Sequence, residues 1–154
     1  MSKLGPRTKQ ARIRVAHLIG GLELGGAESL LYNVSHNHCD VEHTIISLSS
    51  NQKDASRFLT SGRNLYLLEL RKLNSVSPVI KVLRQIREIY RLIRLLARLD
   101  VDVIQTWMYQ SDLIGAVVGT LLRKKIVWGI YSSNLEREYY KRSTYWAIRL
   151  CGWL

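Results

Sequence analysis

The sequence predicts an α/β domain in which a Rossmann-like parallel sheet carries helices on both faces. Short apolar segments alternate along the chain with helix-like segments, and the strand-like segments are apolar on both faces, as in a covered parallel sheet. The chain has 154 residues, 47% of them hydrophobic, which suits one such domain with a sizeable core and is too short for two.

The predicted elements follow one another in a regular order. Residues 13–19 form a buried strand, and residues 27–34 form a helix because their apolar side chains recur on one face. Further strands are expected at 43–48, 65–70, 101–106 and 126–131, and further helices at 53–59, 79–99, 113–122 and 144–150. Because ligands of such sheets bind beyond the carboxyl ends of the strands, the loops starting at Gly20, Trp107 and Tyr131 are expected to gather along one rim.

A glycine-rich segment, residues 20–28, lies between the first strand and the first helix. Glycines let a backbone turn sharply and approach a ligand closely, and the amides of the following helix can meet an anion or a sugar hydroxyl. The spacing Gly-x-Gly-x-x-Gly is absent, and Gly26-Ala27-Glu28 stands where a phosphate-binding P-loop has Gly-Lys-Ser/Thr. A turn without a ligand remains an alternative, since close packing of a helix on a sheet also selects glycine.

The net charge and the cysteine content indicate which classes of partner the protein binds and in which cellular compartment it is found. The net charge of +11 favours an anionic partner such as phosphate, nucleic acid or a membrane surface. Residues 1–12 are expected to form a basic flexible tail without the apolar core of a secretory signal, and no apolar run reaches the roughly 18 residues of a membrane span. Cys39 and Cys151 lack metal-type spacing and are expected as free thiols, so we expect a cytoplasmic protein without a metal site.

The predicted helix at 79–99 carries a stripe of arginines at spacings of three and four residues: Arg84, Arg87, Arg91, Arg94 and Arg98. They lie opposite Leu83, Ile86, Ile89, Ile93 and Leu96, which are expected to face the sheet. In one interpretation the arginines form a solvated outer face of the helix. In the other they contact an anionic membrane, on the inner face of that membrane. Nucleic-acid binding is disfavoured because the helix lacks interleaved aromatic stacking platforms.

Four segments resemble the N-terminal, acceptor-side domain of family 4 glycosyltransferases with GT-B architecture, over residues 13–154: Val-Ala-His-Leu-Ile-Gly-Gly at 15–21, Gly-Gly-Ala-Glu at 25–28, Asp-Val-Ile-Gln-Thr-Trp at 102–107 and Trp-Gly-Ile-Tyr-Ser-Ser-Asn at 128–134. The resemblance implies transfer of a hexose from a nucleotide diphosphate sugar to a glycan or lipid-linked acceptor, with no other cofactor. It also implies a substrate and phosphate cleft made by Gly20, Gly21, Gly25, Gly26 and Glu28. On the acceptor side it implies a stacking face and polar groups from Trp107, Tyr109, Gln110, Asp112, Ser133, Asn134 and Arg137.

The sequence departs from the family's pattern in two respects. Many members carry a histidine in the loops after the fourth or fifth strand, whereas the four histidines here, His17, His36, His38 and His43, lie in the first third of the chain. They are expected to be structural, and the catalytic residues stay unassigned. The sequence also ends before a donor-binding domain, so we expect an acceptor-binding half that is inactive alone. A noncatalytic or split subunit docking a donor-binding partner chain, and a basic module for membranes or nucleic acid, are the alternatives.

Overall fold

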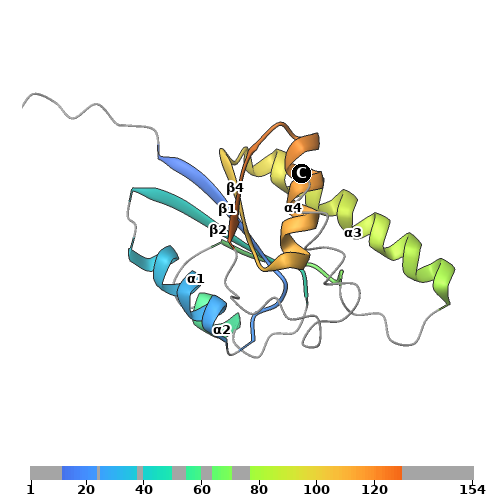
Figure 1. Ribbon diagram of the computed structural model, residues 1–154, viewed down its shortest axis with the longest axis horizontal. Coiled ribbons are helices and arrows are strands. Elements are labelled where there is room, and N and C mark those ends of the chain that lie inside the picture. The colour runs from blue at the N-terminus through green and yellow to red at the C-terminus, as the bar shows by residue number, and fades with distance from the viewer. Residues whose placement is uncertain are drawn as a thin grey trace, which may run out of the picture.

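The computed structural model describes residues 12–23, 25–37, 40–49, 55–59, 64–70 and 77–129. Within these residues a parallel sheet of five strands has the order β3-β2-β1-β4-β5 (Figure 1). The strands are β1 (Ile13–Ile19), β2 (Val41–Ser47), β3 (Asn64–Leu67), β4 (Val103–Trp107) and β5 (Lys125–Gly129). They alternate with the helices α1 (Gly26–Asn37), α2 (Ala55–Leu59), α3 (Pro78–Leu99) and α4 (Tyr109–Leu121). The predicted α/β, Rossmann-like fold is confirmed.

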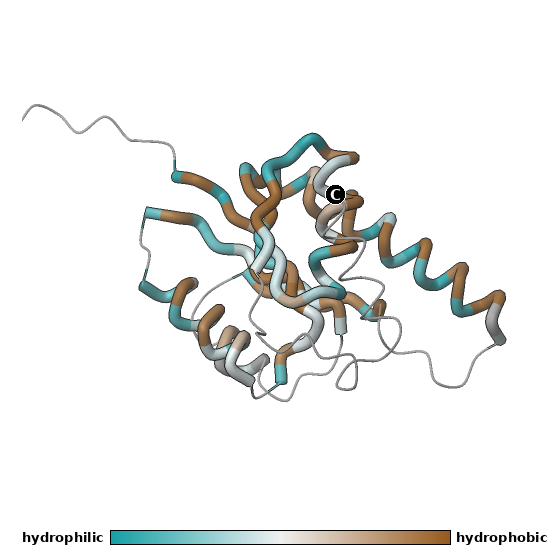
Figure 2. Tube along the Cα trace, viewed as in Figure 1, coloured by the Kyte–Doolittle hydropathy of each residue, from teal (hydrophilic) through white to brown (hydrophobic). Residues whose placement is uncertain are grey.

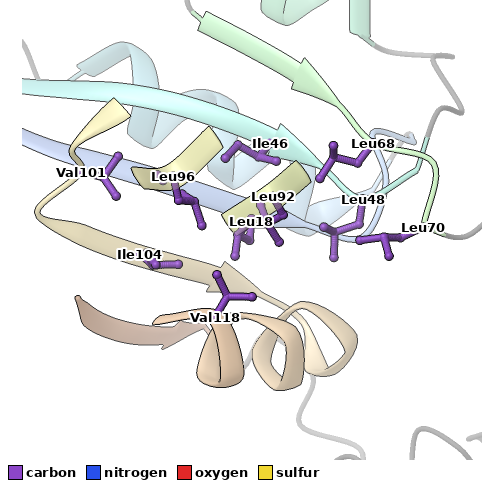
Figure 3. Packing of buried hydrophobic residues seen from close by; sticks show 11 residues of the cluster. Leu18, Ile46, Leu48, Leu68, Leu70, Leu92, Leu96, Val101, Ile104 and Val118 are labelled. Carbon is purple, nitrogen blue, oxygen red and sulfur yellow. The ribbon is translucent and has the colours of Figure 1, made fainter. Parts of the chain in front are cut away.

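Helices cover both faces of the sheet, with α1 and α2 on one face and α3 and α4 on the other (Figure 1). On the first face Leu31 of α1 and Phe58 of α2 pack in one buried cluster with Trp107 of β4. On the other face Leu92 of α3 and Val118 of α4 belong to a second cluster, and Figure 3 shows this cluster packed against the strands. Burial of each large apolar side chain in these clusters stabilises the fold by about 1.5–3 kcal/mol.

Strand β1 lies at the centre of the sheet and serves both clusters. Ala16 and Leu18 belong to the cluster under α3 and α4, and Ile19 belongs to the cluster under α1 and α2. Side chains alternate between the faces of a strand, so His17 shares the face of Ile19. All four side chains are buried, which explains why the strand has almost no polar positions after Arg14.

The most consequential difference from the predicted elements is at the start of α4. This helix begins at Tyr109, four residues before the predicted start at residue 113. The first turn, Tyr-Gln-Ser-Asp, has no apolar period, but Ser and Asp are residues that favour helix N-termini. Side chains predicted to lie in a loop are therefore held on a helix.

The predicted third strand is also longer than β3, which ends at Leu67. The chain beyond it nevertheless stays hydrogen-bonded, because the amides of Leu68 and Leu70 donate to the carbonyls of Ser47 and Leu48 at 2.8 and 3.1 Å. The predicted helix at 144–150, the two cysteines and the basic tail up to residue 11 lie outside the described residues.

Among the described parts of the chain, none of the helices is both long enough and apolar enough to cross a membrane.

Candidate functional site

Two of the three loops predicted to gather at one rim, those that follow β1 and β4, start side by side at the carboxyl edge of the sheet. The third, which starts at Tyr131, lies outside the described residues. The chain leaves β1 toward β2 on one side and returns to β4 on the other, so the strand order reverses between β1 and β4. In the register of these neighbouring strands Ile19 lies opposite Trp107, so both strands end at the same level (Figure 1). Open α/β sheets bind their ligands at such a point, beyond the carboxyl ends of the strands.

The glycine segment joins the end of β1 to the first turn of α1. Gly21 is buried, whereas Gly25 and Gly26 are exposed at the start of the helix. The first helical hydrogen bond of α1 runs from the Ser29 amide to the Gly25 carbonyl at 3.1 Å. The amides at the start of a helix have no partner within it and carry the positive end of its dipole, so they can bind an anion.

The two glycines at the start of α1 differ in what surrounds them. A Cβ on Gly25 would collide with the carboxylate of Glu28, which folds back over this residue from the first turn. A Cβ on Gly26 would meet no atom within 4 Å. Gly25 therefore makes room for Glu28, and Gly26 leaves the backbone open to a ligand.

Met108 joins the end of β4 to α4 in a strained conformation that sequence reasoning missed. Its φ of 72° and ψ of 154° fall in a region that is almost restricted to glycine. The carbonyl of Met108 accepts hydrogen bonds from the amides of Ser111 and Asp112 at 3.0 and 3.1 Å. Its side chain is 45% exposed. Such strain costs about 1–3 kcal/mol and concentrates at functional sites, but no pattern of residue types announces it in a sequence.

Asp112 supports the rim from within and does not reach its surface. The hydroxyl of Thr106 donates a hydrogen bond to a carboxylate oxygen of Asp112 at 2.5 Å, and both side chains are buried. Burial raises the pKa of the Asp112 carboxyl, and the Thr106 hydroxyl offsets this only in part. Of the residues predicted in this loop, Tyr109 is also buried and Gln110 is exposed. Gln110 is thus the one of the three whose polar group is open to a ligand.

Trp107 is fully buried, so its ring offers no exposed stacking face. Its indole nitrogen donates a hydrogen bond to Nδ1 of His17 at 3.2 Å. Because Nδ1 of His17 accepts, its proton is on Nε2, which donates to Nδ1 of His43 at 2.8 Å. Burial, with a contribution from His43, lowers the pKa of His17 to about 3. His17 is therefore a neutral residue of the core, as expected of a structural histidine.

Ser133, Asn134 and Arg137 lie outside the described residues. A hollow of about 820 Å³ lies beside α4 and β5, and the described residues that line it are Ala116, Val117, Thr120, Leu121, Ile126 and Trp128. Among these described lining residues threonine supplies the only hydroxyl and none is charged, which does not suit a sugar or a phosphate. No three His, Cys, Asp or Glu side chains within the described ranges gather as metal ligands would.

Comparison with solved structures shows where the same fold occurs. Neither a protein-family model nor a curated protein matches the chain in sequence. The structure of HepE from Anabaena in complex with UDP matches 91% of the chain with a TM-score of 0.68 and 13% identity, and its complex with UDP-glucose matches the same share with a TM-score of 0.66. MurG from Acinetobacter baumannii matches 75% of the chain with a TM-score of 0.55 and 13% identity.

These matches cover 34 or 35% of the HepE and MurG chains, so the chain spans about a third of their length. HepE and MurG are glycosyltransferases of the GT-B type. The chain shares the fold of a part of such enzymes.

Proposed function

We propose that the chain is the acceptor-side half of a family 4 glycosyltransferase with GT-B architecture. The complete enzyme would transfer a hexose from a nucleotide diphosphate sugar to a hydroxyl of a glycan or lipid-linked acceptor. The observation that carries the proposal is the meeting of the glycine segment and the β4–α4 junction at the point where the strand order reverses. HepE, which shares this fold, has been crystallised with UDP and with UDP-glucose.

In this proposal the start of α1 faces the charge that develops on the leaving diphosphate. Transfer breaks the bond between the anomeric carbon and a diphosphate oxygen, and the acceptor hydroxyl forms the new bond to that carbon. The backbone amides that follow Gly25 are hydrogen-bond donors fixed by the helix. Because Gly26 has no side chain, the phosphate can approach these amides closely. Donors held in place in this way stabilise the transition state without reorganising.

Gln110 and the residues beyond β5 would contact the acceptor. The side chain of Gln110 is exposed in the first turn of α4 and offers both a donor and an acceptor to sugar hydroxyls. We propose the same role for Ser133, Asn134 and Arg137. Trp107 and Asp112, which are buried, would instead hold the rim in shape.

Groups that bind the rest of the donor would come from a further domain or from a partner chain. The chain spans a third of HepE, so these 154 residues alone are expected to bind nucleotide sugar weakly and to transfer no hexose. Turnover of a nucleotide sugar by the purified chain would contradict this division of labour.

A binding experiment with two matched variants tests the proposed phosphate contact. The chain is titrated with UDP-glucose while tryptophan fluorescence or calorimetry reports binding. Gly26→Val should abolish the signal, because the new side chain occupies the space in front of the first amides of α1. Asn33→Val places the same side chain at an exposed position of the same helix and should bind as the parent chain does. Equal binding by both variants would overturn the proposed contact.

A further inference from the structure

Helix α3 is only partly used to cover the sheet. Its C-terminal half places Leu92 and Leu96 in the core, and Figure 3 shows both side chains directed at the strands. Its N-terminal half projects beyond the sheet, toward the right of Figure 1. The periodicity predicted that Leu83 and Ile86 would face the sheet, but these side chains are 61% and 59% exposed. That prediction was wrong, because the sheet ends before this half of the helix begins.

Four of the exposed apolar side chains of α3 form one continuous strip. Val79, Leu83, Ile86 and Tyr90 recur at spacings of three and four residues, and each is more than half exposed. Figure 2 shows hydrophobic and hydrophilic residues alternating along the whole projecting helix. We call these four residues the apolar strip. Exposed apolar residues gathered in this way mark a surface that binds a partner.

The arginines form a second strip beside the apolar one. At roughly 100° per residue, Arg84, Arg87, Arg91, Arg94 and Arg98 are centred about a quarter to a third of a turn from the apolar strip, and the core-facing residues occupy the remaining side. Glu88 is buried and accepts hydrogen bonds from Arg91 and Arg87 at 3.0 and 3.3 Å. Burial raises the pKa of Glu88, but the hydrogen bond and charge of Arg91, the backbone of Glu69 and the hydrogen bond from Arg87 together outweigh burial, so that the pKa is lowered.

Three of these arginines also line a hollow. Arg91, Arg94 and Arg98, together with Tyr66 and Tyr90, border a space of about 320 Å³ between α3 and the end of β3. Arg94 lies over the ring of Tyr90, 5.7 Å from its centre. In the described part of the chain no acidic side chain forms an ion pair with Arg94 or Arg98. The hollow therefore combines positive charge with aromatic rims beside the apolar strip.

We propose that α3 attaches the protein to an anionic lipid bilayer. The apolar strip enters the boundary between headgroups and acyl chains, and the arginine strip contacts lipid phosphates, with one headgroup in the hollow at Arg94 and Arg98. A helix with one apolar and one strongly basic side and low overall hydrophobicity lies in the plane of a membrane interface. The charge selects this occupant: a second copy would bring a chain of net charge +11 and its own arginine strip against the first.

Vesicle binding tests this attachment independently of sugar transfer. The 154-residue chain is sedimented with vesicles of phosphatidylcholine alone and with vesicles that also contain phosphatidylglycerol. We expect binding to the anionic vesicles that weakens as NaCl is added. Equal sedimentation with both kinds of vesicle, or with neither, would overturn the proposal. So would a dimer that forms through α3 and disappears in the Leu83→Gln/Ile86→Gln variant.

Two pairs of matched variants separate the two strips. The variant Arg94→Gln/Arg98→Gln should weaken binding to anionic vesicles about 25-fold, because each arginine contributes about fivefold. The control Arg123→Gln/Lys125→Gln removes the same charge from another part of the surface and should weaken binding much less. Leu83→Gln/Ile86→Gln should weaken binding at least about tenfold at every salt concentration. Val117→Gln/Leu121→Gln, also at exposed apolar positions, should not.

These side chains are exposed, so circular dichroism should show the parent fold in every variant. Equal losses for a variant and its control would show that total charge or total apolar surface is responsible, and the assignment to α3 would fail.

Discussion

The indole nitrogen of Trp107 donates a hydrogen bond to Nδ1 of His17, across the two strands at the centre of the sheet. This bond fixes the tautomer of His17, whose Nε2 then donates to His43 of the next strand. Three neighbouring strands are thus joined by polar side chains inside an otherwise apolar cluster. Such a network stabilises the fold only while each ring keeps its protonation state.

The chain should lose stability in mild acid because His17 is held neutral. Its pKa is about 3 in the folded chain and about 6.5 when unfolded, so the unfolded chain binds the proton first. The stabilisation is complete above about pH 6.5 and falls by about 1.4 kcal/mol per pH unit below it, until the pKa of the folded state is reached. Urea unfolding between about pH 7 and pH 5 measures this slope. In His17→Gln the slope should be shallower, and an unchanged slope would show that another group is responsible.

Gly115 of α4 should resist replacement by alanine. An alanine within a helix normally stabilises it by about 0.5–1 kcal/mol relative to glycine. Here the new Cβ would collide with Cγ2 of Thr106, whose rotamer is held by the hydrogen bond to Asp112. We expect Gly115→Ala to destabilise the chain by about 1–3 kcal/mol in urea unfolding. Gly26→Ala, whose Cβ meets no atom, serves as the control and should not lose stability. A gain for both variants would show that α4 is less tightly packed than described.

Replacing Met108 by glycine should make the chain more stable. Glycine adopts the φ of 72° without the steric cost that methionine bears, and the relief should exceed the added entropy of the unfolded chain by about 1 kcal/mol. Thermal unfolding measures the change. Met108→Ala removes the same side chain but keeps the Cβ, so it should give no such gain. If alanine stabilises as much as glycine, the exposed side chain and not the backbone is the source.

The sequence predicts those parts of the fold that depend on local pattern. Strand β1 was predicted with its observed bounds because all residues of Ile13–Ile19 except Arg14 and His17 are apolar. The start of α4 was missed because its first turn lacks an apolar period and follows a residue whose strain has no signature in composition. The periodicity of the sequence correctly predicted that α3 is a helix with an apolar face. The periodicity carries no information on where the sheet ends, and so did not show which part of that face is exposed.

The candidate site could be predicted less completely than the fold. Two of the three loops start at one rim as predicted, because the carboxyl ends of parallel strands lie at the same edge of a sheet. Which side chains of a loop reach solvent depends on tertiary packing: Trp107 pairs with His17, and Asp112 pairs with Thr106, in contacts between residues whose positions in space the sequence does not give. Gln110 remains exposed in the same segment.

The central claim is that the start of α1, beyond the carboxyl end of β1, receives the diphosphate of a nucleotide sugar. Mapping amide resonances of the isotope-labelled chain during a titration with UDP-glucose tests it most directly. We predict that the amide resonances of Gly26, Ala27 and Glu28 shift, because the diphosphate binds at the start of α1. Shifts confined to the apolar hollow around Val117 and Trp128, or no shifts at any concentration, would contradict it.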